Sequence, residues 1–288
     1  MRLTRRERLL LYVPFVVLVS GWLIVPAVIG LLATLTNYAP TELAVRWVGL
    51  QNFVHILGDR SFAAAIRNVL VVTLVGVPLQ LAIGFGLAFV LRRPFRGRTL
   101  ARVLLLVPWL ISPVASGVMW HFVLAGETSL PNFALGWMGA SPQPSPLGQH
   151  GLALATVVLV ETWRVAPLVA FLLLPGLMSI PHQRWEDATL DGLGSIGTAR
   201  HVALPAIIPL VLAISILLIG GALATFDSVL TMTGGGPGSE TVTPALYSYE
   251  KAFTVSDWPV GAASGWLIGA AVLVVGLAYV RLARWASS

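Results

Sequence analysis

The sequence predicts an all-α membrane protein with about six transmembrane helices. Hydrophobic residues make up 57% of the 288 residues and charged residues only 10%. The apolar residues also gather in runs that are long enough to cross a bilayer. Because an ordinary soluble domain carries about 25% charged residues, the water-facing surface of this chain must be small.

The apolar runs define six expected spans. A spanning helix needs about 20 mostly apolar residues, and prolines inside it are tolerated where neighbouring helices satisfy the freed carbonyl groups. The first run is longer than the apolar core of a signal peptide, so we interpret it as a retained helix. No long linker separates the runs, and we therefore expect one transmembrane domain covering residues 1–288. The expected spans are Leu11–Leu35, Val69–Leu91, Val103–Leu124, Leu152–Leu174, Ile207–Thr225 and Val260–Val280.

The basic residues predict the orientation of these spans. Lys and Arg are retained preferentially in cytoplasmic loops. Of the 18 basic residues, one side of the expected membrane carries only Arg46, Arg60, Arg67 and Lys251. Most of the others lie on the opposite side, so we expect both termini and the segment 181–205 to be cytoplasmic. That group is Arg2, Arg5, Arg6, Arg8, Arg92, Arg93, Arg96, Arg98, Arg102, Arg184, Arg200, Arg281 and Arg284.

The composition excludes several classes of chemistry. The chain has no cysteine, so it forms no disulfide, cysteine-ligated zinc site or iron–sulfur cluster. Its five histidines lack metal-ligand spacing, and we expect no metal site. The net charge of +6 would suggest nucleic acid in a soluble protein, but here it follows from the arginines beside the spans. We therefore expect a lipid bilayer, and no nucleic acid, around this chain.

The segment between the fourth and fifth spans is unusually polar. Glu186, Asp187 and Asp191 lie close together there, but no histidine constellation accompanies them, so a catalytic site is not predicted and a solvated acidic loop is an alternative. The run from Gly192 to Gly197 matches G-x-G-x-x-G, yet the preceding strand and βαβ unit of a dinucleotide site are missing. A short amphipathic helix that turns at Gly192 and ends before Pro205 describes the segment better.

The spacing of apolar residues in this helix suggests a partner surface. Trp185, Ala188, Thr189 and Leu193 recur near helical spacing. An amphipathic helix can place such residues in a groove on another protein while its acidic residues face a basic rim. We expect Glu186 and Asp191 to be the acidic residues of this docking helix.

The same segment resembles the "EAA" signature of the permease subunits of ABC importers. That pattern reads E-A-A, three residues, G, nine residues and I-x-L-P. Glu186, Ala188 and Gly192 match it, and nine residues later Val202 precedes Leu204-Pro205. The departures are Asp187, Leu193 and Ala199, where the pattern usually has Ala, Ala and an aromatic residue. The resemblance implies an ATPase-docking site formed by Glu186, Asp187, Ala188, Asp191, Gly192, Leu193, Leu204 and Pro205.

Further blocks, in the same order along almost the whole chain, resemble the maltose-type carbohydrate uptake branch of that family. They are Gly49–Phe53, Asn68, Trp163–Pro167, Pro175–Pro181, Phe226-Asp227, Thr233–Pro237, Ala252-Phe253 and Gly261. The resemblance implies the type I importer fold in a bacterial or archaeal inner membrane. It also implies a second homologous permease, two copies of a cytoplasmic ABC ATPase and an extracytoplasmic solute-binding protein as partners. ATP and Mg would be bound by the ATPase, with no cofactor in this chain.

Charged residues inside the spans are candidates for a solute path. Glu161 and Arg164 are three residues apart and therefore share one helical face. Burying either alone in lipid is costly, so they should face protein or water, as a structural ion pair or as solute contacts. Trp163 is adjacent, and Phe226 and Asp227 lie at the outer end of the fifth span. We expect a sugar path at these five residues.

The glycine triplet at 234–236 predicts an outer turn. A phosphate-binding P-loop needs Lys followed by Ser or Thr, and the only lysine of the chain, Lys251, precedes Ala252. The chain therefore carries no Walker A motif and is not expected to be an enzyme. The family resemblance implies that Thr233, Gly234, Gly235, Gly236 and Pro237 face an external binding protein.

Three alternatives remain open at this level. The chain could carry another small solute, such as a glycerophosphodiester or polyamine. An intramembrane enzyme would need a compact set of acids, bases or metal ligands inside the spans, and only Glu161 and Arg164 qualify. A membrane scaffold would not need the docking spacing.

Overall fold

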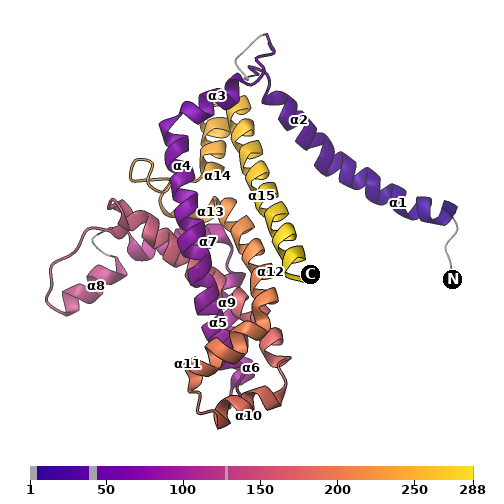
Figure 1. Ribbon diagram of the computed structural model, residues 1–288. Coiled ribbons are helices and arrows are strands. Elements are labelled where there is room, and N and C mark those ends of the chain that lie inside the picture. The colour runs from indigo at the N-terminus through magenta and orange to yellow at the C-terminus, as the bar shows by residue number, and fades with distance from the viewer. Residues whose placement is uncertain (1–4, 39–43, 127–128, 288) are drawn as a thin grey trace.

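The computed structural model describes residues 5–38, 44–126 and 129–287, and apart from one isolated β-bridge between Thr36 and Trp47 its regular secondary structure is helical (Figure 1). Arg2 and the other residues of the range 1–4 lie outside the described part. The helices with α-helical geometry are α1 (Arg5–Val19), α2 (Val25–Ala33), α3 (Gln51–Gly58), α4 (Arg60–Val71), α5 (Val77–Leu91), α6 (Arg98–Leu110), α7 (Pro113–Leu124), α8 (Leu130–Trp137), α9 (Leu152–Met178), α10 (His182–Leu190), α11 (Ser195–Thr198), α12 (Leu204–Leu223), α13 (Asp227–Met232), α14 (Pro244–Tyr249) and α15 (Trp258–Ser287).

Short π-helical segments join several of these helices. They are η1 (Ser20–Ile24), η2 (Val72–Gly76), η4 (Ala199–Ala203) and η5 (Glu250–Thr254), and η3 (Pro146–Gly148) is a 3₁₀ turn. Three of the π segments directly precede a proline in the first turn of the next helix: Pro26, Pro78 and Pro205. Because proline lacks an amide hydrogen, a local π adjustment lets the helix continue through it.

Five continuous helices among the described residues are long and apolar enough to span a membrane. They are Tyr12–Ala33, Arg60–Leu91, Leu152–Met178, Ser195–Leu223 and Trp258–Ala278. The largest extensions beyond the expected spans are at two N-terminal ends. The helix of the expected second span begins at Arg60, and that of the expected fifth span begins at Ser195, so the latter runs through Pro205 instead of ending before it.

The expected span at 103–124 is broken. α6 and α7 are bent by 89° relative to each other. The break lies at Ser112, because Pro113 disfavours helical geometry in the residue before it, and Ser112 is indeed extended with ψ 148°. The Ser112 hydroxyl then accepts a hydrogen bond from the Ala115 amide and starts α7. Counting the pair as one, the described residues contain up to six spans.

α9 is the central helix of the bundle. In its most apolar 18-residue stretch 61% of the residues are buried, whereas in that of the N-terminal span 0% are buried. α5 packs along α9 so closely that a β-carbon added to Gly84 would lie 2.5 Å from Val169 Cγ1. Figure 1 shows the opposite case for the N-terminal span, where α1 leads away from the bundle. The centre of the fold is therefore built from α5, α9 and α12.

Candidate functional site

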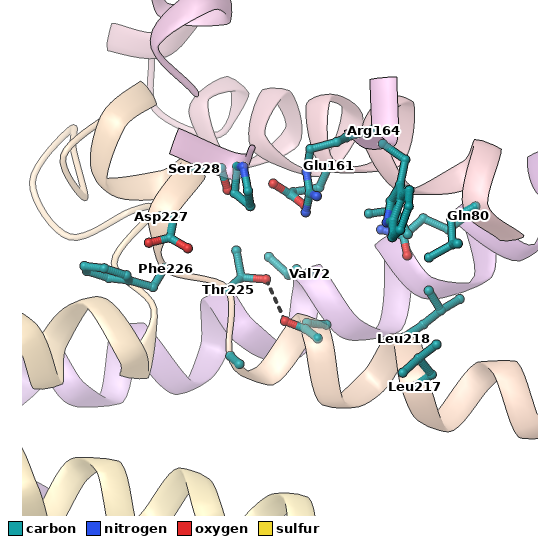
Figure 2. Close-up of a pocket in the computed structure, with 17 residues that line it drawn as sticks. Val72, Gln80, Glu161, Arg164, Leu217, Leu218, Thr225, Phe226, Asp227 and Ser228 are labelled. Atoms are coloured by element: carbon teal, nitrogen blue, oxygen red, sulfur yellow. Dashed lines mark hydrogen bonds and ion pairs between the residues drawn. The ribbon is translucent and has the colours of Figure 1, made fainter. Parts of the chain in front are cut away.

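A cavity of about 440 Å³ lies inside the bundle, where α9 faces α12 and the start of α13. Figure 2 shows Glu161 and Arg164 projecting into it, with Gln80 at one end and Asp227 at the other. Ligand pockets typically measure 300–1,000 Å³, so this space suits a small solute. Its lining is Val72, Gln80, Trp109, Pro113, Glu161, Arg164, Val165, Leu168, Leu217, Leu218, Gly221, Ala222 and Ala224–Ser228.

Glu161 and Arg164 form a buried ion pair in the cavity wall. Arg164 Nη2 donates to Glu161 Oε2 at 2.7 Å, and the side chains are only 15% and 8% exposed. The pair leaves polar capacity unused, because Glu161 Oε1 and Arg164 Nε are buried without a partner among the described residues. Buried polar atoms are costly when unsatisfied. Because Glu161 Oε1 has almost no accessible surface in this conformation, its side chain must move before that oxygen can accept a hydrogen bond from water or a solute hydroxyl.

Among the lining residues that were not predicted from the sequence, Gln80 and Trp109 bring polar groups on large side chains. Gln80 is 7% exposed and brings an amide from α5, and Trp109 brings an indole from α6. Gln80 could have been predicted from the sequence, because it is the only amide side chain in the apolar run 69–91. Trp109 could not, because its position depends on the bend after α6.

The other predicted path residues divide into two groups. Phe226 and Asp227 line the cavity, at the point where the chain leaves α12 and enters α13. Trp163 does not line it, because its indole packs edge-on against Trp120 with ring centroids 5.4 Å apart. Residues 161 and 164 share one face of α9, and Trp163 falls on a different face.

The predicted outer turn at 233–237 is a closely tied loop. Gly234 and Gly235 have positive φ angles of 58° and 88°, which favour glycine. The Thr241 hydroxyl donates to the Gly236 carbonyl at 2.9 Å, and the Asn68 amide donates to the carbonyl groups of Ser239 and Val242. The turn is therefore pre-formed by the fold.

The segment 182–194 forms a helix and a sharp turn at the end of the bundle opposite the turn at 233–237 (Figure 1). Gly192 has a φ of 73°, a left-handed conformation that lets the chain reverse. The Leu193 amide donates to the Ala188 carbonyl at 2.9 Å and closes the turn. The expected turn at Gly192 is present in the structure.

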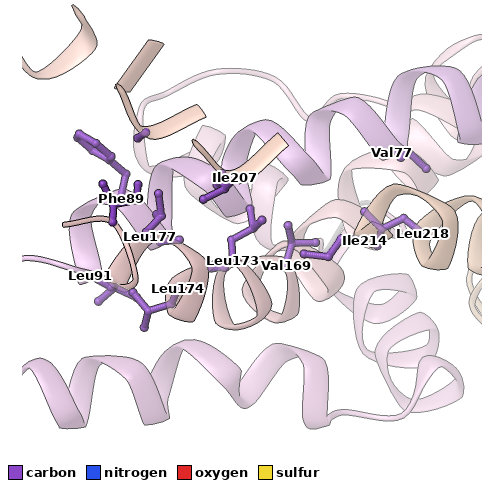
Figure 3. Packing of buried hydrophobic residues seen from close by; sticks show 14 of the residues in the cluster. Val77, Phe89, Leu91, Val169, Leu173, Leu174, Leu177, Ile207, Ile214 and Leu218 are labelled. Carbon is purple, nitrogen blue, oxygen red and sulfur yellow. The ribbon is translucent and has the colours of Figure 1, made fainter. Parts of the chain in front are cut away.

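The inner face of α10 contacts the protein itself. Ala188 is 2% exposed, and the Trp185 ring lies 6.2 Å from Phe89. The Arg92 guanidinium stacks on Trp185, 3.5 Å from the ring centroid, and Arg93 donates to the Ser195 hydroxyl. Phe89 belongs to the end of the apolar cluster in Figure 3. Ala188 is therefore buried by this chain itself, whereas Trp185 is only partly buried and also lines an open groove with Thr189 and Leu190. The docking role of the segment stays a prediction.

The outer face of the segment exposes a different pair of apolar residues. Leu190 and Ile196 are each 85% exposed, on the two sides of the Gly192 turn. Asp187 and Asp191 line an open groove nearby, together with Leu193 and Pro205. Glu186 is exposed and lies 3.0 Å from His182. Leu190 and Ile196 escaped the sequence interpretation because the motif spacing directed it to the buried face.

No cluster of three or more His, Asp or Glu residues that could hold a metal occurs in the part of the chain that the structure describes. A helical bundle with a polar cavity between its spans and an exposed helical turn at one end has the architecture of a membrane permease. Residues 80–288 match the family described as binding-protein-dependent transport system inner membrane component. The chain belongs to this family.

Curated relatives and a solved structure agree with this assignment. A probable ABC transporter permease protein, y4oQ of Sinorhizobium fredii, is 33% identical over 84% of this chain and 78% of its own length. The trehalose/maltose transport system permease protein MalF of Thermococcus litoralis is 29% identical over 83% and 80%. A bacterial ABC transporter involved in alginate import has a similar fold, with a TM-score of 0.84 at 20% identity, covering 99% of this chain and 98% of that one.

Proposed function

We propose that this chain is a permease subunit of an ATP-driven, binding-protein-dependent importer for a sugar or oligosaccharide. The cavity beside Glu161 and Arg164 is the observation that carries this proposal. Sugars present many hydroxyl groups and apolar ring faces. The charged pair, the Gln80 amide and the Trp109 indole match those features. The trehalose/maltose system of one relative supports the same solute class.

The chain would contribute binding differences between conformations and no bond-breaking chemistry. A second homologous permease would complete the path, and two cytoplasmic ATPase subunits would bind ATP and Mg. Closure of the ATPases would move the docking helix α10 and shift the bundle between inward-facing and outward-facing states. A solute affects that equilibrium only through its different affinities for the two states.

The docking surface in this proposal is the outer face of the turn at Gly192. Leu190 and Ile196 supply exposed apolar contacts, and Asp187 and Asp191 supply acidic ones. The positive-inside distribution of arginines supports a cytoplasmic position for this surface and for both termini. The membrane would be the inner membrane of a bacterium or archaeon. The pre-formed turn at 233–237 would then face an extracytoplasmic binding protein.

Uptake by the complete transporter in proteoliposomes tests the proposal. Radiolabelled disaccharides and oligosaccharides are compared with a glycerophosphodiester and a polyamine, each with the cognate binding protein. Saturable, ATP-dependent uptake of a carbohydrate supports the assignment. Uptake of only the phosphodiester or the polyamine replaces the solute class, and the absence of ATP-dependent uptake of any solute overturns the importer function.

The docking assignment has a separate test at Gly192. Proline cannot adopt its φ of 73° and removes the amide that donates to the Thr189 carbonyl at 3.1 Å. Gly192→Pro should abolish solute-stimulated ATPase activity while the chain still inserts. Gly194→Ala is the matched control, since Gly194 has a φ of −67° and open space around an added β-carbon. Normal stimulation in Gly192→Pro would remove the docking role.

A further inference from the structure

An apolar groove runs along the surface between α6 and α9, away from the central cavity. It has a volume of about 470 Å³ and is lined by Arg102, Phe171, Leu174, Pro175, Met178 and Ser179. A second, narrow space lined by Leu105 and Leu106 continues from it along α6. Figure 3 shows Leu91 and Leu174, which border this narrow space, side by side at one end of the apolar cluster.

The wall of this groove is built for hydrocarbon. Phe171 and Met178 are 51% and 55% exposed, and on α6 Val103 and Val107 are also exposed. These residues lie within or next to membrane-spanning helices, so their exposed faces are not turned toward bulk water. The groove therefore offers one acyl chain a shaped surface where the rest of the helix offers a convex one.

A single cation closes one end of the groove. Arg102 Nη2 donates to the Leu91 carbonyl at 3.1 Å and approaches Met178 Sδ at 3.8 Å. Both partners are uncharged, and Arg102 forms no salt bridge with any residue that the structure describes. An arginine in this position keeps a full positive charge that no carboxylate of the described chain neutralises.

The surroundings increase the positive charge at this end. Arg98 lies one turn before Arg102 on α6, and Arg93 and Arg96 are exposed in the connection from α5. Basic pockets between transmembrane helices at a membrane surface favour anionic lipid headgroups. Guanidinium groups bind phosphate oxygens in a planar, two-pronged geometry that an ammonium group cannot reproduce.

We propose that this groove binds one anionic phospholipid, with its phosphate on Arg102 and one acyl chain along Phe171, Leu174 and Met178. The site is separate from the cavity at Glu161 and Arg164, and its existence does not depend on which solute the transporter carries. A lipid bound there would tie α6 to α9 on the side of the bundle nearest to the docking turn.

Native mass spectrometry of the complete, delipidated transporter tests the site. Phosphatidylglycerol is titrated against phosphatidylcholine with the same acyl chains, and glycerol 1-phosphate tests the headgroup without chains. Wild type should retain one phosphatidylglycerol more tightly than phosphatidylcholine. Arg102→Gln should weaken phosphatidylglycerol binding by roughly 10-fold or more, as expected for a hydrogen bond to a charged group. The exposed Arg96→Gln is the control and should change it by on the order of twofold.

Phe171→Ala provides an independent variant at a half-exposed position. It shortens the apolar wall, so it should weaken both phospholipids and leave the preference for phosphatidylglycerol unchanged. The proposal fails if Arg102→Gln binds phosphatidylglycerol like wild type, or if Arg96→Gln weakens it equally. Competition by glycerol 1-phosphate at the same concentration would also overturn it, because the acyl chain would then contribute nothing. Where Arg102→Gln does not assemble, unchanged binding in Phe171→Ala overturns the proposal.

Discussion

The buried pair of Glu161 and Arg164 can be tested as a structural contact and as a solute contact in one set of variants. Arg164→Leu leaves the Glu161 carboxylate without its cation, and Glu161→Leu leaves the guanidinium without its anion. The double variant removes both charges and fills the space with apolar side chains. Arg164 Nη2 and Glu161 Oε2 lie 2.7 Å apart and both side chains are largely buried. Each single change should therefore leave a buried charge without its partner.

The expected loss of unfolding free energy follows from that burial. Removing one partner of a buried ion pair typically costs about 3–5 kcal/mol, whereas replacing both by apolar residues is often neutral or stabilising. We expect the lower end, about 3 kcal/mol, for each single variant because the cavity can admit water. With about 2–4 °C per kcal/mol for a chain of this size, each single variant should lower the melting temperature by roughly 6–12 °C. The double variant should melt near wild type.

Two measurements on the purified transporter separate the roles. Thermal unfolding reports the pair as a structural contact, and uptake in proteoliposomes reports it as part of the path. If the pair contacts the solute, the double variant should be stable but inactive. A double variant with wild-type uptake would remove the pair from the path. Single variants that melt within about 2 °C of wild type would refute the buried-charge reasoning.

Three further predictions concern packing, coupling and pH. Gly84→Ala should cost about 1–3 kcal/mol of unfolding free energy, because the new β-carbon would lie 2.5 Å from Val169 Cγ1; Gly86→Ala, with open space around it, should be neutral in the same thermal assay. Arg92→Ala should remove the stacking on Trp185, worth about 0.5–2 kcal/mol. Solute-stimulated ATPase activity should then fall by roughly twofold to 30-fold. Equal stimulation in Arg92→Ala and in the exposed Arg96→Ala would contradict this coupling. Burial opposes ionisation of Asp59, but hydrogen bonds from Tyr247, the Ser61 amide and Lys251 prevail and lower its pKa. The ionised carboxylate therefore stabilises the fold above an ordinary carboxyl pKa of about 4, and that stability is lost as the pH falls below this value. Between pH 5 and 3 the melting temperature of Asp59→Asn should fall less than that of wild type, and parallel curves would refute the reasoning.

The membrane class and most spans could be predicted because hydrophobic length is a local property. A run of about 20 apolar residues is long enough to cross the bilayer as a helix, and that length can be read from the residues themselves. The bend at Ser112 is local as well, since Pro113 disfavours a helical residue before it. Its consequence was not predictable, because whether a proline breaks a spanning helix or is absorbed, as at Pro205, depends on the packing around it.

The segment 182–194 shows the same division between backbone geometry and side-chain contacts. Gly192 is required by a left-handed turn, and the motif spacing located that turn correctly. The spacing could not decide which contacts α10 makes, because the apolar pattern at Trp185 and Ala188 is the same whether a helix packs on its own protein or on a partner. Arg92, 93 residues earlier in the chain, decides between the two by stacking on Trp185.

By itself, the sequence determined the helical membrane class, the family motif and the glycine that turns the docking segment. These follow from hydrophobicity, spacing and backbone geometry within a few residues. Only the tertiary structure decided that Gln80 and Trp109 join Glu161 and Arg164 around one cavity while Trp163 turns away. The physical reason is that a side chain enters a cavity through the packing of helices distant in the chain, here α5, α6, α9 and α12, and no local pattern records that packing.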